Sequence, residues 1–319
     1  MLSEKAIAWL LDAPETYIRY QALLFLKPEE ADPRLLDGDP FIRRNIQEVA
    51  LWRDSILERH DKPDLFIHRL AMLADLGVTP ATEGMRSIID NLLANINQEG
   101  VFPIAISIPT AFGGTGRPSK EWLICDFPVV VYALLRMGIK DDRLEKAAGR
   151  LVELAGAEFY PCCGSIPKFK GPGPKGGMCP YANLLVARAL ALHPEYRKSA
   201  EAKRAAGAVL GHWAKRKEKK PFLFGMGTDF QKLKYPFVWY NLLHVLTALA
   251  PIEGVNADSG YQEMLELLGA KQDEDGRVKP ESIYMVYKSE EWSNKKAPSR
   301  LLTIRAHQVL QRAGMLMVN

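Results

Sequence analysis

A stretch that is apolar on nearly every side runs from Lys234 to Leu249, and Pro236 stands near its start. Proline is tolerated in the first turn of a helix, because the amide it lacks has no partner there. The only interruptions after Pro236 are Asn241, His244 and Thr247, which are three apart and so fall on one stripe of a helix. The pattern therefore predicts a buried helix with one polar edge facing a cavity.

Related units recur along the chain from residue 60 onward. Prolines at 63, 128, 180, 236 and 298 precede mostly apolar runs at 65–76, 129–137, 183–192, 237–250 and 301–310. Segments with a strong polar face lie between these runs, at 82–97, 141–155, 195–213 and 259–268, and three helices at 4–11, 15–26 and 40–59 precede the first unit. The pattern predicts twelve helices in which apolar and amphipathic members alternate.

This alternation predicts an all-α protein with a single domain over residues 1–319, made of N-terminal helices (1–60) and helix-pair repeats (61–319). An (α/α)6 toroid fits best, with the apolar helices as the inner ring. An open α-solenoid is the rival, but its repeats are about 33 to 47 residues long and the units here are longer.

The connections after the amphipathic helices are long, at 101–121, 157–178, 215–235 and 271–297, whereas those after the apolar helices are short. In an alternating up-and-down arrangement, all connections of one kind lie at the same end. We therefore expect the four long loops to surround the mouth of a central cavity, where function usually resides.

Two short motifs resemble a repeat of a known superfamily. Gln272-Asp273-Glu274-Asp275-Gly276-Arg277-Val278 and the shorter Gln98-Glu99-Gly100-Val101-Phe102 are similar to the glutamine-and-glycine repeat of squalene and hopene cyclases and of protein prenyltransferase β subunits. The resemblance extends from about residue 60 to the end and implies a toroid that binds or transforms an isoprenoid-like ligand. Neither the Asp-x-Asp-Asp cluster of the cyclases nor the Asp-x-Cys zinc motif of the prenyltransferases is present, so the resemblance implies catalytic residues that differ or are absent.

Composition narrows the class of protein. The 319 residues are 47% hydrophobic, and 42 Lys and Arg against 38 Asp and Glu give a net charge of +4 at pH 7, too mild to predict nucleic-acid binding. No apolar run reaches the length of about 20 residues that spans a membrane, and no signal-type segment follows Met1. We therefore expect a cytoplasmic protein without a membrane span, with its four cysteines reduced.

Candidate ligand-binding residues gather on the expected loop face. Basic residues exceed acidic ones in three of the four long loops, and the inner helices present their amino ends to that face, which favours a phosphate or carboxylate. The residues expected to meet the anionic end are Arg117, Lys175 and Lys234; those expected to line the apolar part are Trp122, Tyr132, Trp239, Tyr240 and Asn241. Part of the charge, at 215–220, also fits the solvated end of an outer helix.

Proton transfer and metal binding have separate candidates. His244 on the polar stripe, together with Asp126 and Asp229, is a candidate for acid–base catalysis. A histidine exchanges protons near neutral pH, and a carboxyl group does so when its surroundings shift its pKa. Cys125, Cys163 and Cys179 come from neighbouring repeats and predict a zinc site, with Asp126 as a fourth ligand. The alternatives are a histidine satisfied within the core and cysteines that pack as small hydrophobic residues.

Three functions follow from this pattern. The first is an enzyme or binding protein for a small, partly apolar and anionic ligand. The second is a scaffold whose cavity is filled by its own side chains and whose loop face binds a protein. The third is a carbohydrate lyase or hydrolase, which needs two carboxylates facing each other across a groove.

Overall fold

The computed structural model describes residues 2–171, 176–218 and 224–315, and in these ranges it is mostly helical, so the all-α prediction is confirmed. The described ranges contain twelve α-helices: α1 (Glu4–Leu11), α2 (Thr16–Leu26), α3 (Pro40–Ala50), α4 (Phe66–Asp75), α5 (Met85–Asn95), α6 (Phe127–Arg136), α7 (Asp142–Glu153), α8 (Pro180–Leu190), α9 (Ala200–Ala214), α10 (Leu242–Leu249), α11 (Ser259–Gly269) and α12 (Arg300–Arg312). A hairpin of β1 (Ile104–Ile106) and β2 (Ser119–Glu121) lies in the loop between α5 and α6. No described helix is long and apolar enough to cross a membrane.

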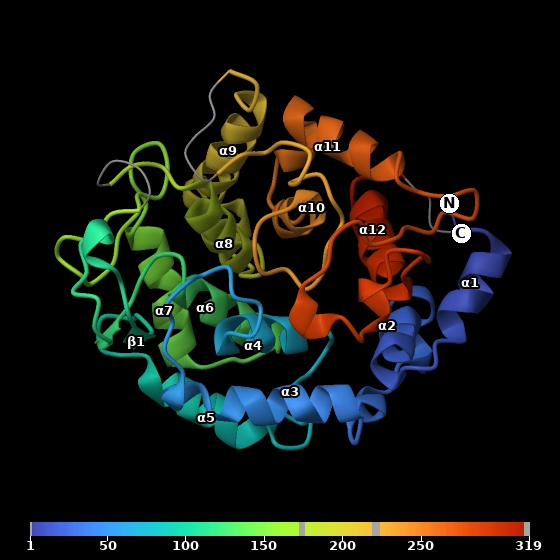
Figure 1. Cartoon of the computed structure of the whole chain (residues 1–319), viewed down its shortest axis with the longest axis horizontal. Coiled ribbons are helices and arrows are strands. Elements are labelled where there is room, and N and C mark those ends of the chain that lie inside the picture. Colours follow the sequence, from blue (N-terminus) through green and yellow to red (C-terminus); the bar gives the residue numbers. More distant parts are fainter. Residues whose placement is uncertain (1, 172–175, 219–223, 316–319) are drawn as a thin grey trace.

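The even-numbered helices contact one another in sequence. α4 packs on α6, α6 on α8, α8 on α10, α10 on α12, and α12 on α2 (Figure 1). Gln21 Nε2 on α2 then donates to the carbonyl of Leu76 after α4, over 2.9 Å, so the series of contacts returns to its start. Odd-numbered helices lie outside this set: α7 contacts α6 and α8, and α11 contacts α10 and α12.

Burial separates the two sets as the hydrophobic pattern predicts. Every residue of α8 is buried, whereas α7 buries Leu144, Ala147, Ala148 and Leu151, which lie three or four positions apart. The spacing in α7 produces one apolar stripe, so one face of that helix is buried. The composition of α8 requires cover on all sides. One hydrophobic core runs from Ala13 near the start to Leu310 near the end of the chain.

The prediction that the third helix reaches residue 59 is wrong. α3 ends at Ala50, and a 3-10 turn (Trp52–Asp54) buries the Trp52 ring 5.4 Å from the ring of Phe102. Leu57 then pairs with β1, donating to the carbonyl of Ala105 over 2.8 Å. Tertiary packing of Trp52 and pairing with the hairpin thus replace the last turns of the expected helix.

The prediction that Pro236 opens a helix is also wrong. The segment before α10 is irregular and contains a cis peptide bond between Tyr235 and Pro236. The helix begins at Leu242, because the Asn241 side chain accepts a hydrogen bond from the His244 amide over 3.0 Å as an N-cap. Residues 234–241 therefore form an irregular loop before α10.

The long loops contact one another in two pairs. Ile124 donates to the carbonyl of Cys163 over 3.0 Å, and Lys170 donates to the carbonyl of Phe112 over 3.1 Å, which joins the first two loops. Glu281 donates to the carbonyl of Leu233 over 2.9 Å, which joins the last two.

The two glycine motifs form the same turn after α5 and after α11. Asn97 and Asp273 each donate from the backbone to the residue four positions on, and each accepts from the glycine three positions on, Gly100 or Gly276. Both glycines have positive φ, 73° and 80°, which L side chains rarely adopt. The repeat read from the sequence is therefore present as a repeated backbone turn.

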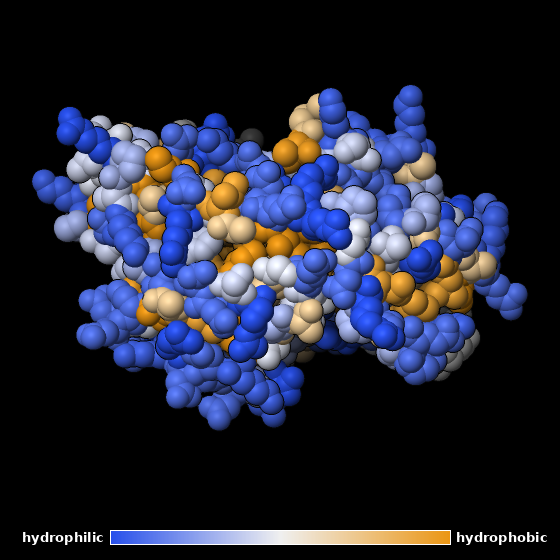
Figure 2. Space-filling view, turned by 90° about the horizontal axis from the view of Figure 1, so that it is seen from below, coloured by the Kyte–Doolittle hydropathy of each residue, from blue (hydrophilic) through white to orange (hydrophobic). Residues whose placement is uncertain are grey.

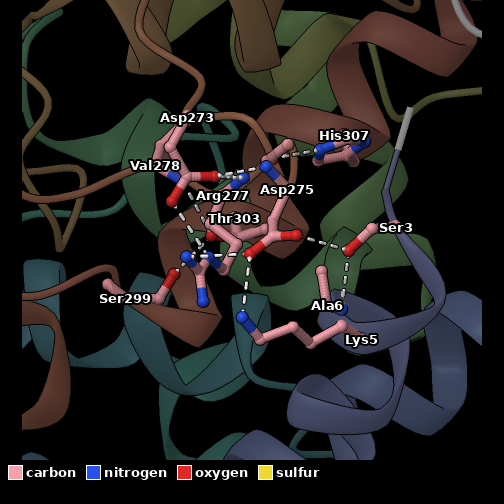
Figure 3. Close-up of polar contacts among 11 residues, drawn as sticks. Ser3, Lys5, Ala6, Asp273, Asp275, Arg277, Val278, Ser299, Thr303 and His307 are labelled. Atoms are coloured by element: carbon pink, nitrogen blue, oxygen red, sulfur yellow. Dashed lines mark hydrogen bonds and ion pairs between the residues drawn. The ribbon is translucent and has the colours of Figure 1, made fainter.

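The second of these turns joins the first and last helices (Figure 3). Asp275 accepts from the Ser3 hydroxyl over 2.9 Å, and the His307 ring on α12 lies 2.7 Å from the carbonyl oxygen of Gly276. The edge of the molecule nearest α3 and α5 is mostly hydrophilic, with hydrophobic side chains showing through in separate groups (Figure 2).

Candidate functional site

Three side chains of different chemistry meet near the amino ends of α4 and α6: His60, Cys125 and Asp126. The His60 Nδ1 atom lies 2.7 Å from Asp126 Oδ1, and the Cys125 sulfur lies 3.4 Å from His60 Nε2. Their donor atoms all lie within 4.8 Å of one another. We call these three residues the loop-end cluster.

Asp126 occupies the N-cap position of α6 without capping it. Aspartate at this position normally accepts hydrogen bonds from the first helical amides, but here no side-chain cap is formed. Oδ1 pairs with His60, and the buried Oδ2 has no partner among the described residues. Because a buried carboxylate oxygen without a partner is costly, this atom marks a place for a ligand or cation.

The backbone of His60 is held in place by a hydrogen bond from His68. The carbonyl oxygen of His60 lies 2.7 Å from Nε2 of His68 on α4, and a carbonyl accepts only, so this His68 nitrogen carries the proton. Burial is the main cause that lowers the pKa of His68 to about 4, which keeps that ring neutral at pH 7. The side chain of His60 is 24% exposed, so the loop-end cluster is open to solvent on the histidine side.

The Cys125 thiol is not arranged as an activated nucleophile. Its sulfur lies at similar distances from both ring nitrogens of His60, 3.4 and 3.8 Å, so it is not in line with the Nε2 lone pair. Burial, and next the nearby Asp126 carboxylate, raise the pKa of this thiol well above its ordinary value. A catalytic cysteine requires the opposite shift.

The same three donors suit a transition metal. Zinc sites that act in catalysis have three protein ligands from Cys, His and Asp or Glu, and keep a fourth position open. A cation beside the loop-end cluster would stabilise the thiolate form of Cys125 and supply the missing partner of Asp126 Oδ2.

An aromatic wall adjoins the loop-end cluster. Tyr181 on α8, whose pKa is raised by burial and then by the nearby Cys125 and Asp126, stacks on Trp239 with ring centroids 4.4 Å apart. The Trp239 ring stacks in turn on Phe224 at 5.8 Å. Trp239 is half-buried, so this wall faces outward beside the cluster.

Lys234 lies in the same region. Its ammonium sits 3.5 Å from the centroid of the Tyr284 ring, and burial lowers the pKa of Lys234. The Tyr284 hydroxyl accepts a hydrogen bond from the Trp239 amide over 3.2 Å, which connects the lysine to the aromatic wall. A half-buried cation thus borders an apolar surface.

A cavity lies at the other end of the inner helices, away from the long loops. Its volume is about 470 Å³, and it is lined by the last turns of α4, α6, α8, α10 and α12, including Asp75, Tyr132, Arg136, Arg188, Leu192, Phe237, Thr247, Arg305, Gln308, Val309 and Arg312. We call it the turn-end cavity, because the short turns surround it. The expectation of a central cavity that opens toward the long loops stays a prediction, since parts of two of these loops lie outside the described residues.

Residues of the irregular segment before α10 separate the two ends. Tyr235 and Phe237 are buried there, with ring centroids 5.3 Å apart, and the Phe237 ring stacks on His244 at 5.1 Å. His244 is fully buried, and burial lowers its pKa well below the ordinary value. The candidate general base therefore lies inside the core rather than on an accessible wall.

The other predicted site residues are dispersed. Asn241 is the N-cap of α10, Trp122 is buried against Phe127, and Tyr132 donates to Asp75 at the turn end. Arg117 is exposed on the hairpin loop, Asp229 is exposed and pairs with Lys232 over 3.0 Å, and Lys175 lies outside the described residues. Among the described site residues that the sequence predicted, Cys125, Asp126, Cys179, Trp239, Tyr240 and Lys234 lie in the region of the loop-end cluster.

The predicted zinc ligands need a correction. Cys162, not Cys163, neighbours Cys125 and Cys179, since its pKa is raised to about 12 by burial and then by Cys179. Cys163 is turned away, and the one charge that acts on its pKa besides burial is Arg150. Adjacent residues of an extended chain point to opposite sides, so one of the two had to face away.

His60 was missed because the sequence placed it at the end of a helix. His60 is 65 residues before Cys125 in the sequence, so the two residues form no local motif with the spacing of a metal site. The Cys125-Asp126 pair directly before an apolar helix was the available signal.

Searches against protein-family models, curated proteins and solved structures find no match to this chain.

Proposed function

We propose that this protein is an enzyme of the α/α-toroid class and that its reaction takes place at the loop-end cluster. The toroid assignment is supported by the sequential contacts of α2, α4, α6, α8, α10 and α12, by the bond from Gln21 back to Leu76, and by the repeated glycine turn. The resemblance to squalene cyclases and prenyltransferase β subunits suggests the same architecture.

The observation that carries the functional proposal is the meeting of His60, Cys125 and Asp126 around an unpartnered carboxylate oxygen. In this proposal the three residues hold a zinc ion, which supplies a Lewis acid when bound. Asp126 and His60 would bind and orient the metal ion through a carboxylate oxygen and a ring nitrogen, and Cys125 would contribute a thiolate. His68 is a positioning residue that fixes the backbone of His60.

The substrate we propose is small, partly apolar and anionic, with isoprenoid-like molecules first on the resemblance. Trp239 and Tyr181 offer flat aromatic surface beside the loop-end cluster, which suits an alkyl chain or a developing cation. Lys234 is half-buried and cationic at the same wall, which suits a phosphate or carboxylate group.

Metal analysis tests the centre. We expect the purified protein to retain about one zinc per chain, and Cys125→Ser to lose most of it, since sulfur is the ligand that favours zinc. Cys163→Ser is the matched control and keeps the metal. Cobalt substitution gives a second readout: a thiolate-to-cobalt absorption in the wild type that is absent in Cys125→Ser. Protein that neither retains nor takes up zinc or cobalt would contradict the proposal.

Ligand binding tests the substrate class. A prenyl diphosphate titrated into the protein is expected to bind. Trp239→Ala and Lys234→Met should each raise the dissociation constant about tenfold, which is a loss of about 1.4 kcal/mol of binding free energy. Arg117→Gln is the control, because Arg117 is exposed away from the aromatic wall. Absence of binding sinks the isoprenoid assignment and leaves the metal proposal to its own test.

A scaffold function is the second candidate, because one observation favours it. Tyr235, Phe237 and His244 fill the space between the inner helices, so the centre of the molecule is occupied by its own side chains. A protein partner bound by the loop face, with no metal and no small ligand, would support the scaffold instead. Carbohydrate cleavage stays a prediction.

A further inference from the structure

We propose that the turn-end cavity is a binding site for a small organic phosphate, distinct from the loop-end cluster. Four arginines, Arg136, Arg188, Arg305 and Arg312, line this cavity of about 470 Å³, and Asp75 is the one acidic residue among the described residues that line it. The lining therefore carries an excess of positive charge, although the protein as a whole is only mildly basic.

The floor of the cavity is a fixed network around Asp75. Arg188 Nη2 lies 2.5 Å from Asp75 Oδ2, the Tyr132 hydroxyl donates to Oδ1, and Arg305 Nη2 donates to the Asp75 carbonyl over 2.6 Å. The Arg188 guanidinium also lies 3.8 Å from the centroid of the Tyr132 ring. These contacts hold two guanidinium groups rigid before any ligand arrives.

Both buried arginines keep an unused donor. Arg188 is 3% exposed and Arg305 is 4% exposed, yet Nη1 of Arg188 and Nε of Arg305 have no hydrogen-bond partner in the described structure. An unmade hydrogen bond at a buried charged group is costly. Both donors belong to residues that line the cavity, and an anion bound there is the acceptor that we propose for them.

Arg136 and Arg312 stand at the rim. Both are exposed, both line the cavity, and neither makes an ion pair with a carboxylate in the described ranges. Neutralising the carbonyl ends of α6 and α12 is an ordinary use for such residues. It does not account for Arg188 and Arg305, whose guanidinium groups bind Asp75 and Gln21 from inside the molecule.

The chemistry favours phosphate. Planar guanidinium groups pair with phosphate and carboxylate oxygens in a forked geometry, and several of them around one group match an anion with more than one charge. The remaining lining includes Leu192, Phe237 and Val309 beside Gln308 and Gln311, so the cavity has room and apolar surface for an organic part.

Calorimetric titration with inorganic pyrophosphate, repeated with citrate, tests this site. We expect pyrophosphate to bind, with an affinity that falls as salt is added, and Arg136→Gln/Arg312→Gln to weaken it at least tenfold. Both substitutions are at exposed positions, so the fold is retained. Arg188→Lys, which keeps the charge but loses the fork, is expected to weaken binding as well.

Two controls separate this site from others. Arg117→Gln/Arg197→Gln removes the same charge from exposed positions outside the cavity and is expected to change the affinity less than twofold. Cys125→Ser, at the loop-end cluster, is expected to bind pyrophosphate like the wild type. No binding of pyrophosphate, equal weakening in the charge control, loss of binding in Cys125→Ser, or binding of citrate alone would each overturn the proposal.

Discussion

His244 shows how burial changes the role of a residue that the sequence marks as catalytic. Its Nδ1 atom lies 3.3 Å from the carbonyl oxygen of Trp239, which accepts only, so the proton sits on Nδ1. Nε2 has no partner in the described structure, and burial, and next the Arg188 charge, keep the pKa of the ring well below its ordinary value. The ring therefore stays neutral where the unfolded chain takes up a proton.

This difference predicts an acid sensitivity that depends on His244. Because the folded-state pKa is lowered, the neutral ring favours folding fully above about pH 6.5, and that contribution is lost as the pH falls below the unfolded value. His244→Phe should flatten the dependence of unfolding free energy on pH between 7 and 5 by about 1.4 kcal/mol per unit below pH 6. Denaturant titrations at pH 5, 6 and 7 measure it, and an unchanged slope would refute it.

Asp75 provides a second test at the level of single residues. Its carboxylate is the ion-pair partner of the buried Arg188, so Asp75→Asn leaves an uncompensated charge in the core. Breaking one partner of a buried pair costs about 3–5 kcal/mol. Thermal unfolding should show a large loss of stability. Asp229→Asn is the matched control, because that carboxylate is exposed and its ion pair contributes at most about 1 kcal/mol.

The repeated element of this protein is a helix pair closed by a glycine turn. The turn after α5 has φ of +73° at Gly100, and a Cβ there would lie 2.9 Å from the carbonyl oxygen of Lys146 on α7. Gly138, with φ of +77°, has open space around it. The first glycine is thus required by conformation and by packing, the second by conformation alone.

Alanine substitutions separate these two effects. Gly138→Ala should cost roughly 1–2 kcal/mol for the left-handed backbone, and Gly100→Ala should cost more, since α7 must also move. Urea denaturation of both variants gives the comparison. Equal losses would show that the close approach of the turn to α7 is not maintained in solution.

At the scale of the whole molecule, the ends of the chain are tied together. Ser3 donates from its hydroxyl and its amide to Asp275, and Arg300 on α12 donates to the carbonyl of Trp9 over 2.9 Å. The helices α1 and α12 are far apart in sequence, so these contacts connect the first unit of the chain to the last; Figure 3 shows the contact between Ser3 and Asp275.

Asp275→Ala should loosen this connection without unfolding the molecule. We expect faster amide hydrogen exchange in α1 and in the turn at 272–278, with little change in α6 and α8, because local opening needs less free energy than global unfolding. The matched control is Asp273→Ala, which disrupts the turn but leaves the Ser3 contact in place. Unchanged exchange in α1 after Asp275→Ala would contradict a closed arrangement.

Periodicity by itself determined the number, order and alternation of the helices, because whether a helix is buried on one face or on all sides is written in its spacing of apolar residues. The glycine turns were also readable, since positive φ is a local requirement. Local patterns carry no information on which residues meet across long separations. Tertiary structure alone decided that His60 joins Cys125 and Asp126, that Trp52 ends α3, that residues 234–241 fill the centre, and that arginines from the ends of three helices line one cavity. Each of these depends on contacts between segments far apart in the chain, and their free energy outweighs the local preference.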